Sequence, residues 1–444
     1  MEASNSNKLG TEPIGKLLLS MSSQTILALM VYAIYSITDI FFVSRGVGPL
    51  AAAGVSVSSP LLIALGAVST TVGAGGASIV SRALGAKNTE KASRTIANAF
   101  VIFWIAAILV TIFGLLFLDR LTILMGATEN ILPFAKSYGK IILIGAISST
   151  GYSAIVRADG NIRYSTAMWL IPVGTNILLD PIFIYIFHWG VSGAAVATVI
   201  AQVISAGMGI YFFFFRKESS YRMRAKYFFP KRELTAEILL VGLPSFLKNM
   251  SASLIAVITN NLLKELGGDA ALSVYAIVGK LYTGFATPMV GIMQGMQPIA
   301  GYNFGRKEYP RVKKAIRLSL ITSVFYGILV CIVCIAIPIM LLSVMSKDSI
   351  VILSGVPAFR RMALAFPLCG ITLMVSAYFQ ATGNASKAVA LSLGGIIAVK
   401  IPVLITLSLL FGLNGIWLSE AVSELFLCII SLWMLRRYHN KSLF

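Results

Sequence analysis

The chain has 444 residues, of which 57% are hydrophobic and only 12% are charged, and its formal net charge is +19. Soluble globular domains carry about a quarter charged residues, so this composition excludes a soluble protein and indicates one embedded in a lipid bilayer. The positive charge lies mainly between apolar runs, where anionic lipid headgroups and membrane topology explain it better than nucleic-acid binding does.

Twelve apolar runs follow one another along the chain. A membrane-spanning helix needs about 20 mostly apolar residues, and the runs lack the alternation of barrel strands. They therefore predict an all-α integral membrane protein with twelve transmembrane helices. The first run follows a polar tail without a small-residue cleavage site, so we expect it to be retained rather than removed as a signal peptide. The runs cover residues 15–44, 50–78, 97–118, 132–156, 164–187, 192–215, 236–263, 271–300, 316–342, 357–380, 388–410 and 413–435.

The basic residues are distributed unevenly between the two ends of these spans. Most Lys and Arg residues fall in the N-terminal tail, in the loops after even-numbered spans and in the C-terminal tail. Cytoplasmic loops of membrane proteins carry this excess. We therefore expect cytoplasmic N- and C-termini, in a multi-pass protein of the plasma (inner) membrane.

The chain contains an internal duplication with an offset of 220 to 223 residues. Because each copy holds six spans, an even number, both copies enter the membrane in the same direction. This predicts two pseudo-symmetric six-helix bundles: an N-lobe at 1–215, a cytoplasmic connector at 216–235 and a C-lobe at 236–444. Among the matching segments, Gly85-Ala86-Lys87 recurs as Gly305-Arg306-Lys307, Trp189-Gly190 as Phe411-Gly412, and Ala158-Asp159-Gly160-Asn161 as Ala381-Thr382-Gly383-Asn384.

Oxygen-bearing side chains gather on three spans of the first copy. Asp39 lies deep in the first span, and Asn176 and Asp180 are four residues apart on one face of the fifth. Thr198 and Gln202 share a face of the sixth in the same way. An ionised carboxylate at mid-membrane costs at least about 2.5 kcal/mol, so such groups usually face inward and act in function. Carboxylate, amide and hydroxyl oxygens suit a hard cation or proton exchange.

The second copy carries different acidic residues. Glu420 and Glu424 lie four apart on the last span, where they could receive a cationic substrate or a proton. They could equally pair with Lys400 on the preceding span, and both interpretations stay open. Aligning the copies places Asp39 opposite Asn260, Asp180 opposite Pro402, Thr198 opposite Glu420 and Gln202 opposite Glu424.

Further polar residues are candidates to line a substrate cavity, although a single residue of this kind more often packs between helices. These candidates are Gln24, Tyr32, Tyr35, Gln202, Gln294, Gln297, Glu420 and Glu424. The sequence has no phosphate-binding loop of the G-x-x-x-x-G-K-[S/T] type, so we expect no ATP-driven transport by this chain. It has only two histidines, His188 and His439. We expect no enzyme, no cofactor and no metal site beyond a possible Na⁺.

Five segments and the duplication carry a resemblance to known transporters, namely Ile37–Val43, Ser81–Lys87, Arg157–Asn161, Asn176–Pro181 and Gln380–Asn384. In these features the chain resembles transporters of the multidrug and toxic-compound extrusion (MATE) family, in its DinF-like branch, over nearly its full length. The resemblance implies two six-helix lobes forming a V around a central cavity. It also implies an antiporter that exports organic, often cationic and amphipathic compounds against H⁺ or Na⁺. Asp39, Asn176, Asp180 and Thr198 match the positions of the N-lobe cation site of that branch.

Two departures from the family pattern bear on mechanism. Gln24 stands where the family usually has a first-span proline, and Asn260 and Asn261 stand in the seventh span where other branches have a carboxylate. We therefore place ion coupling in the first copy. The alternative function is a flippase or exporter of one dedicated amphiphile, such as a lipid-linked precursor or a natural product. The expected partners are small organic molecules and the bilayer, not nucleic acid, and the expected state is a monomer.

Overall fold

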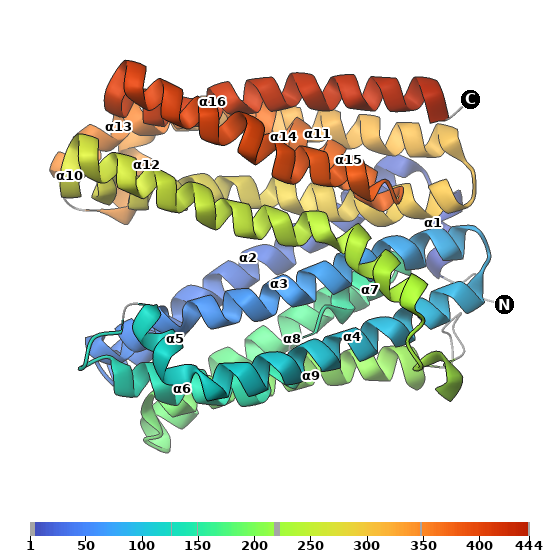
Figure 1. Ribbon diagram of the computed structural model, residues 1–444, viewed down its shortest axis with the longest axis horizontal. Helices are drawn as coiled ribbons and strands as arrows, with labels where there is room; N and C mark the ends of the chain where they lie inside the picture. Colours follow the sequence, from blue (N-terminus) through green and yellow to red (C-terminus); the bar gives the residue numbers. More distant parts are fainter. Residues whose placement is uncertain (1–4, 126, 149, 217–222, 347–348, 443–444) are drawn as a thin grey trace. The chain divides into compact units, whose positions relative to one another are not determined.

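The computed structural model describes residues 5–125, 127–148, 150–216, 223–346 and 349–442, and all regular elements among them are helices (Figure 1). The prediction of an all-α protein is thereby confirmed. The first half contains α1 (Asn5–Thr11), α2 (Ile14–Gly46), α3 (Pro49–Gly85), α4 (Thr89–Leu116), α5 (Leu118–Leu124), α6 (Leu132–Ile144), η1 (Gly145–Ser148), α7 (Tyr152–Ala158), α8 (Ile162–Pro181), η2 (Ile182–Ile186), α9 (Gly190–Phe214) and η3 (Ala225–Tyr227). The second half contains α10 (Arg232–Gly305), α11 (Tyr309–Ala336), α12 (Pro338–Met345), α13 (Ser349–Ala363), α14 (Phe366–Ala381), α15 (Ala385–Val389), η4 (Ala390–Gly394), η5 (Ile396–Lys400) and α16 (Ile401–Ser442).

Several spans are bent or joined end to end. Within the described residues, ten helices are long and apolar enough to cross a membrane, and a further pair, Val351–Ala363 and Phe366–Ala381, is bent by 46°. One of the ten, Ala385–His439, has 55 residues. At about 1.5 Å per residue that is more than twice the thickness of a bilayer core. It turns back at Gly412 (φ 57°, ψ −136°), so it supplies two spans, and the described part of the chain then contains the twelve predicted.

The helices extend beyond the apolar runs that predict them. The second apolar run ends at residue 78, but α3 continues to Gly85. The third run begins at residue 97, but α4 already starts at Thr89. Polar residues continue these helices past the lipid, and the side chain of Asn88 caps α4 by accepting from the Lys91 backbone N–H at 2.8 Å. An apolar run therefore marks the lipid-facing part of a helix and not its ends.

The duplication is repeated in the backbone. Lys87 and Lys307 both adopt the left-handed conformation, with φ of 58° and 64°. After each of them the chain forms the same helix-ending turn, in which Asn88 N–H donates to Ala83 O at 2.8 Å and Glu308 N–H to Asn303 O at 2.9 Å. A non-glycine residue adopts this conformation only where the surrounding structure requires it. Its occurrence at equivalent positions supports a common origin of the two copies.

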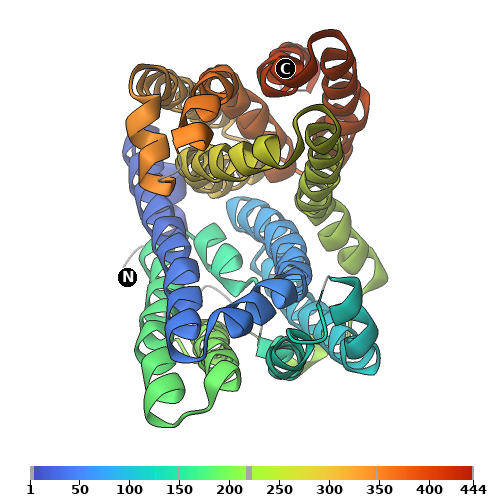
Figure 2. The same ribbon diagram turned by 90° about the vertical axis from the view of Figure 1, so that its left-hand side faces the viewer.

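The chain divides into two compact units, each with its long helices side by side in both views (Figure 1, Figure 2). The first unit comprises Met1–Thr11 and Leu27–Gly242, and the second comprises Glu12–Ile26 and Leu243–Phe444. The first turns of α2 and of α10 therefore each group with the other half of the sequence.

Small residues allow close helix packing in the first unit. A Cβ added to Gly54 on α3 would lie 2.7 Å from Phe134 of α6, and one on Gly73 would lie 3.0 Å from the backbone oxygen of Gly151. With little hydrophobic driving force between helices in lipid, such close backbone contact is a main source of stability. It holds α6 and the start of α7 against α3.

The predicted connector has 217–222 outside the described residues, and its remainder packs on α4. Asn98 Nδ2 donates to Tyr227 O at 3.2 Å, and Lys231 N–H donates to Asn98 Oδ1 at 3.1 Å. The guanidinium of Arg94 lies 4.8 Å from the centre of the Tyr227 ring. This part of the connector is therefore fixed to the first unit.

The core of the second unit is formed by α10, α11, α12, α13, α14 and α16. Phe359 and Phe366 are fully buried, and the Phe366 ring stacks on Tyr282 with centroids 4.7 Å apart. Gly327 brings α11 against the backbone of Phe366. The same packing holds Tyr282 of α10, whose hydroxyl reaches the charged cluster on α16 that is described below.

Candidate functional site

Asp39 and Asp180 lie together inside the first unit. Asp39 is on α2 and is 6% exposed, and Asp180 is in the last turn of α8 and is fully buried. Their carboxyl groups are within hydrogen-bonding reach of each other. Two carboxyl groups form such a bond only when one of them carries a proton. The pair thus has the geometry to hold a shared proton.

Asn176 links this pair to α9. Oriented to satisfy its neighbours, its amide nitrogen donates to Oδ2 of Asp180 at 3.1 Å, and its oxygen accepts from the Thr198 backbone N–H at 3.1 Å. Asn176 is fully buried and lies one helical turn before Asp180. The helix then widens into the π-helical turn η2, a feature that often occurs at functional sites.

Thr198 completes the set from α9. Its hydroxyl lies 3.3 Å from the Tyr35 hydroxyl and 3.4 Å from the side-chain amide of Asn176. It is 4% exposed. The four residues predicted as a cation site thus come from three helices and lie around one point of the first unit.

One oxygen of each carboxyl group has no partner. Oδ1 of Asp39 and Oδ1 of Asp180 are buried and accept no hydrogen bond from any residue that the structure describes. An unpaired buried charge is costly, so the site is most stable when it holds a positive charge. A proton or a small hard cation among carboxylate, amide and hydroxyl oxygens would supply it. Among the residues that the structure describes, no group of three His, Cys, Asp or Glu side chains is arranged to hold a metal ion.

Three predicted cavity residues adjoin this site. Tyr35 contacts Thr198 directly, and Tyr32 is 46% exposed with its ring edge-on to Trp169 at 5.4 Å. Gln202, one turn beyond Thr198, has a buried Oε1 without a partner among the described residues. A polar path therefore extends from the carboxyl pair along α2 and α9.

Tyr138 on α6 is a further residue of the site that was not predicted from the sequence. It is 1% exposed, and its hydroxyl is within hydrogen-bonding reach of Thr198. The duplication contains a signal for it. At an offset of 221 residues stands Phe359, which is also buried, so the copies differ here by one hydroxyl group.

The other polar candidates lie in the second unit. Gln24, on the first part of α2, is half-buried and donates to the Ser20 hydroxyl at 3.4 Å. Gln297 donates to Gln380 at 2.8 Å, which in turn donates to Ser245 at 3.0 Å. Gln294, one turn before Gln297, is also half-buried. These three candidates therefore belong to a different compact unit from the carboxyl pair.

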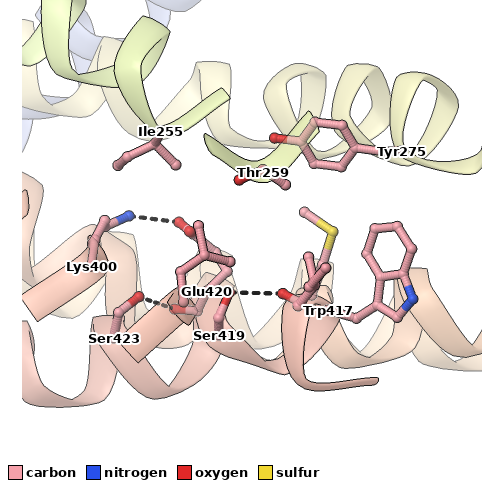
Figure 3. Close-up of a pocket in the computed structure, with 11 residues that line it drawn as sticks. Ile255, Thr259, Tyr275, Lys400, Trp417, Ser419, Glu420 and Ser423 are labelled. Atoms are coloured by element: carbon pink, nitrogen blue, oxygen red, sulfur yellow. Dashed lines mark hydrogen bonds and ion pairs between the residues drawn. The ribbon is translucent and has the colours of Figure 1, made fainter. Parts of the chain in front are cut away.

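Glu420 and Glu424 both pair with Lys400. The ammonium group lies 2.7 Å from Oε1 of Glu420 and 2.8 Å from Oε1 of Glu424. The pairing of both glutamates with Lys400, one of the two interpretations that the sequence left open, is therefore present in the structure. Glu420 and Lys400 also line a cavity of about 40 Å³ between α10 and α16 (Figure 3).

A duplicated helical scaffold with a buried polar site is typical of membrane transporters. The chain matches the family model MatE over residues 25–182 and 244–406 and belongs to this family. It is thus a multi-pass membrane transporter and not an enzyme.

The chain is similar to several curated multidrug export proteins named MepA. The one from Staphylococcus haemolyticus is 26% identical over 434 residues, covering 96% of this chain and 94% of that protein. The one from Staphylococcus saprophyticus is 28% identical over 398 residues, covering 88% and 86%.

Solved structures share the fold. A MATE crystal structure in a bent conformation superposes with a TM-score of 0.93 at 23% identity, covering 99% of this chain and 98% of that one. A MOP superfamily transporter from Pyrococcus furiosus gives a TM-score of 0.90 at 23% identity, covering 98% of each chain. The predicted MATE-like fold is confirmed.

Proposed function

We propose that the chain is a secondary active multidrug efflux antiporter, which exports organic, often cationic and amphipathic compounds in exchange for H⁺ or Na⁺ by alternating access. Membership of the MatE family and similarity to proteins named as multidrug exporters support the substrate class. The observation that carries the coupling is the buried pair Asp39 and Asp180, whose Oδ1 atoms have no described partner.

Coupling follows from charge. Entry of H⁺ or Na⁺ between the carboxyl groups balances one of their two negative charges and favours the closed packing of α2, α8 and α9 around the ion. Departure of the ion leaves like charges that repel and a site that needs another cation. A cationic substrate binds nearby more tightly when the ion site is empty and less tightly when the ion site is filled. Reciprocity then requires the substrate to weaken ion binding by the same factor.

The placement of the ligands follows from the same site. Asp39, Asn176, Asp180 and Thr198 hold the coupling ion, and Tyr32, Tyr35 and Gln202 form the adjoining wall that the substrate contacts.

We assign residues 1–215 to an N-lobe, 236–444 to a C-lobe and 216–235 to a cytoplasmic connector. The distribution of basic residues supports cytoplasmic N- and C-termini, and we propose that the protein is a monomer in the plasma membrane.

The test uses the purified chain in proteoliposomes, with a pH gradient and a sodium gradient imposed in separate experiments. Efflux of a fluorescent organic cation is measured for the wild type, Asp39→Asn and Asp180→Asn. The matched control is Asp119→Asn, which removes an exposed carboxylate of the same unit that pairs with Lys136 at 2.7 Å.

We expect one of the two gradients to drive efflux in the wild type and in the control, and neither to drive it in the two site variants. Full gradient-driven efflux in both Asp39→Asn and Asp180→Asn would contradict the site assignment. Gradient-driven transport of one amphiphile with no export of diverse cations would instead favour the flippase alternative.

A further inference from the structure

The second unit contains a charged cluster that the coupling site does not use. Lys400, at the end of η5, bridges Glu420 and Glu424 of α16 at 2.7 and 2.8 Å. The Tyr282 hydroxyl donates to Oε1 of Glu420 at 3.5 Å. The side chains of Lys400, Glu420 and Glu424 are 17%, 24% and 6% exposed, so the cluster lies inside the unit.

The cluster has one negative charge more than its ion pairs balance. A single ammonium serves two carboxylates, and Oε2 of Glu424 is buried without a partner among the described residues. Lys248, whose side chain is exposed, offsets part of the Glu424 charge but forms no ion pair with either glutamate among the described residues. Glu420 therefore shares the Lys400 ammonium with a second carboxylate, and this leaves it able to pair with an additional monovalent cation.

A cavity lies on the Glu420 side of the cluster. Its volume of about 40 Å³ accommodates a few water molecules or a small ionic head group. In Figure 3, Lys400 and Glu420 point toward each other at one end, and the rings of Tyr275 and Trp417 stand at the other. The centroids of those two rings are 6.2 Å apart. An ammonium group within about 6 Å of the centroid of an aromatic ring is attracted to the face of that ring.

The remaining lining of the cavity suits an organic cation better than a bare metal ion. The hydroxyls of Ser419 and Ser423 donate to backbone oxygens of their own helix at 2.7 and 3.1 Å. Their oxygens therefore remain able to accept a ligand N–H group. Apolar side chains, including those of Met362 and Leu404, cover much of the rest.

This cavity is the counterpart of the coupling site in the duplicated unit. Glu420 occupies the repeat position of Thr198, Glu424 that of Gln202, and Thr259 that of Thr38. The second copy has therefore kept an intramembrane polar site at this position while changing its charges.

We propose that Glu420, Tyr275 and Trp417 form a receptor for the ammonium head group of an organic cation, with Lys400 as the resident counter-ion that the ligand displaces. This inference rests on the proposed export of organic cations and adds a second binding site to it. When the ligand pairs with Glu420, Lys400 keeps Glu424 as its partner. Two ion pairs then replace one shared ammonium, and the excess charge is balanced.

The test measures binding of benzylammonium to the full-length protein in lipid nanodiscs by calorimetry, with no gradient present and with empty nanodiscs subtracted. Benzyl alcohol serves as the uncharged probe of similar shape. Three variants change the charge balance in known directions: Glu420→Gln, Glu424→Gln and Lys400→Gln. The matched control, Glu265→Gln, changes an exposed carboxylate of α10 in the same unit.

We expect Glu420→Gln to weaken benzylammonium binding roughly tenfold to a hundredfold, the range for loss of a charge-assisted hydrogen bond. Glu424→Gln should also weaken it, although Glu424 does not line the cavity, because Lys400 is then left with Glu420 alone. Lys400→Gln should strengthen it, and Glu265→Gln should leave it unchanged. A monodisperse elution profile and an unchanged unfolding temperature verify that each variant is folded.

Three results would overturn the proposal. They are equal affinity in all four variants, benzyl alcohol binding as tightly as benzylammonium, or displacement of benzylammonium by sodium chloride but not by choline chloride at equal ionic strength. The last would assign the site to an inorganic cation. Asp39→Asn should retain binding here while it loses gradient-driven efflux, so failure of this site and failure of the antiport proposal are separately visible.

Discussion

Arg82 on α3 and Glu237 on α10 form an ion pair of 3.3 Å across 155 residues of sequence. Lys91 approaches the same carboxylate at 3.0 Å. The first turns of α10 thereby join α3 and α4 in the first unit, although the repeat assigns them to the second copy. The ion pair therefore joins residues from the two copies of the sequence repeat, although both residues belong to the first compact unit.

Replacing Glu237 by Gln should lower the free energy of unfolding by about 1 kcal/mol, the upper range for partly exposed pairs. The side chains of Arg82 and Glu237 are 21% and 31% exposed, so the loss should shrink at high salt. A double-mutant cycle with Arg82→Gln, measured by thermal unfolding, isolates the pair. Strictly additive effects of the two substitutions would show that the contact contributes nothing.

A second prediction concerns glycines at equivalent positions of the repeat. A Cβ at Gly193 would lie 2.9 Å from Cβ of Phe183, whereas one at Gly415 would overlap the backbone oxygen of Leu407. Backbone atoms of Phe183 also lie 3.0 and 3.1 Å from the Cβ added at Gly193, but the overlap at Gly415 is deeper. Gly415→Ala should therefore destabilise more than Gly193→Ala, by about 1–3 kcal/mol for overpacking. Thermal unfolding measures this order. Gly66→Ala is the control, because no atom lies within 4 Å of its added Cβ.

Thr198 offers a prediction about ion affinity. Thr198→Val keeps the shape but removes the hydroxyl near Tyr35 and Asn176, so buried polar groups lose a partner at a cost of about 1–3 kcal/mol. The concentration of the coupling ion that gives half-maximal efflux should rise about tenfold or more. Thr198→Ser, which restores the hydroxyl, should recover most of the affinity. Equal values for the Val and Ser variants would remove Thr198 from the ion site.

Much of the architecture could be predicted from the sequence for a simple reason. In lipid every backbone polar group must be satisfied within the segment, so long apolar runs become helices. Spacing of four residues also placed Asn176 with Asp180 and Glu420 with Glu424 on common helix faces. Whether Lys400 serves both glutamates could not be decided, because that depends on how η5 packs against α16.

Tyr138 shows a second limit of the sequence. A tyrosine in an apolar run is unremarkable in composition, and it belongs to a span without any acidic residue of its own. Only the packing of α6 against α9 brings its hydroxyl to Thr198. Comparison of Tyr138 with Phe359, its equivalent in the second copy, could have identified the position, because the two residues differ by one polar atom. The structure shows that both are buried.

Tyr138→Phe should therefore act on ion binding and not on folding. The ring stays in its buried place, and loss of one neutral hydrogen bond costs about 0.5–1.5 kcal/mol. This corresponds to a rise of about twofold to tenfold in the half-maximal ion concentration. The control is Tyr211→Phe, which removes a hydroxyl from a residue that is 55% exposed. Efflux from proteoliposomes at graded ion concentrations measures both, and thermal unfolding verifies their stability. If Tyr138→Phe and Tyr211→Phe have the same ion dependence, the Tyr138 hydroxyl only fills space beside Thr198. A selective shift for Tyr138→Phe would extend the ion site from three helices to four.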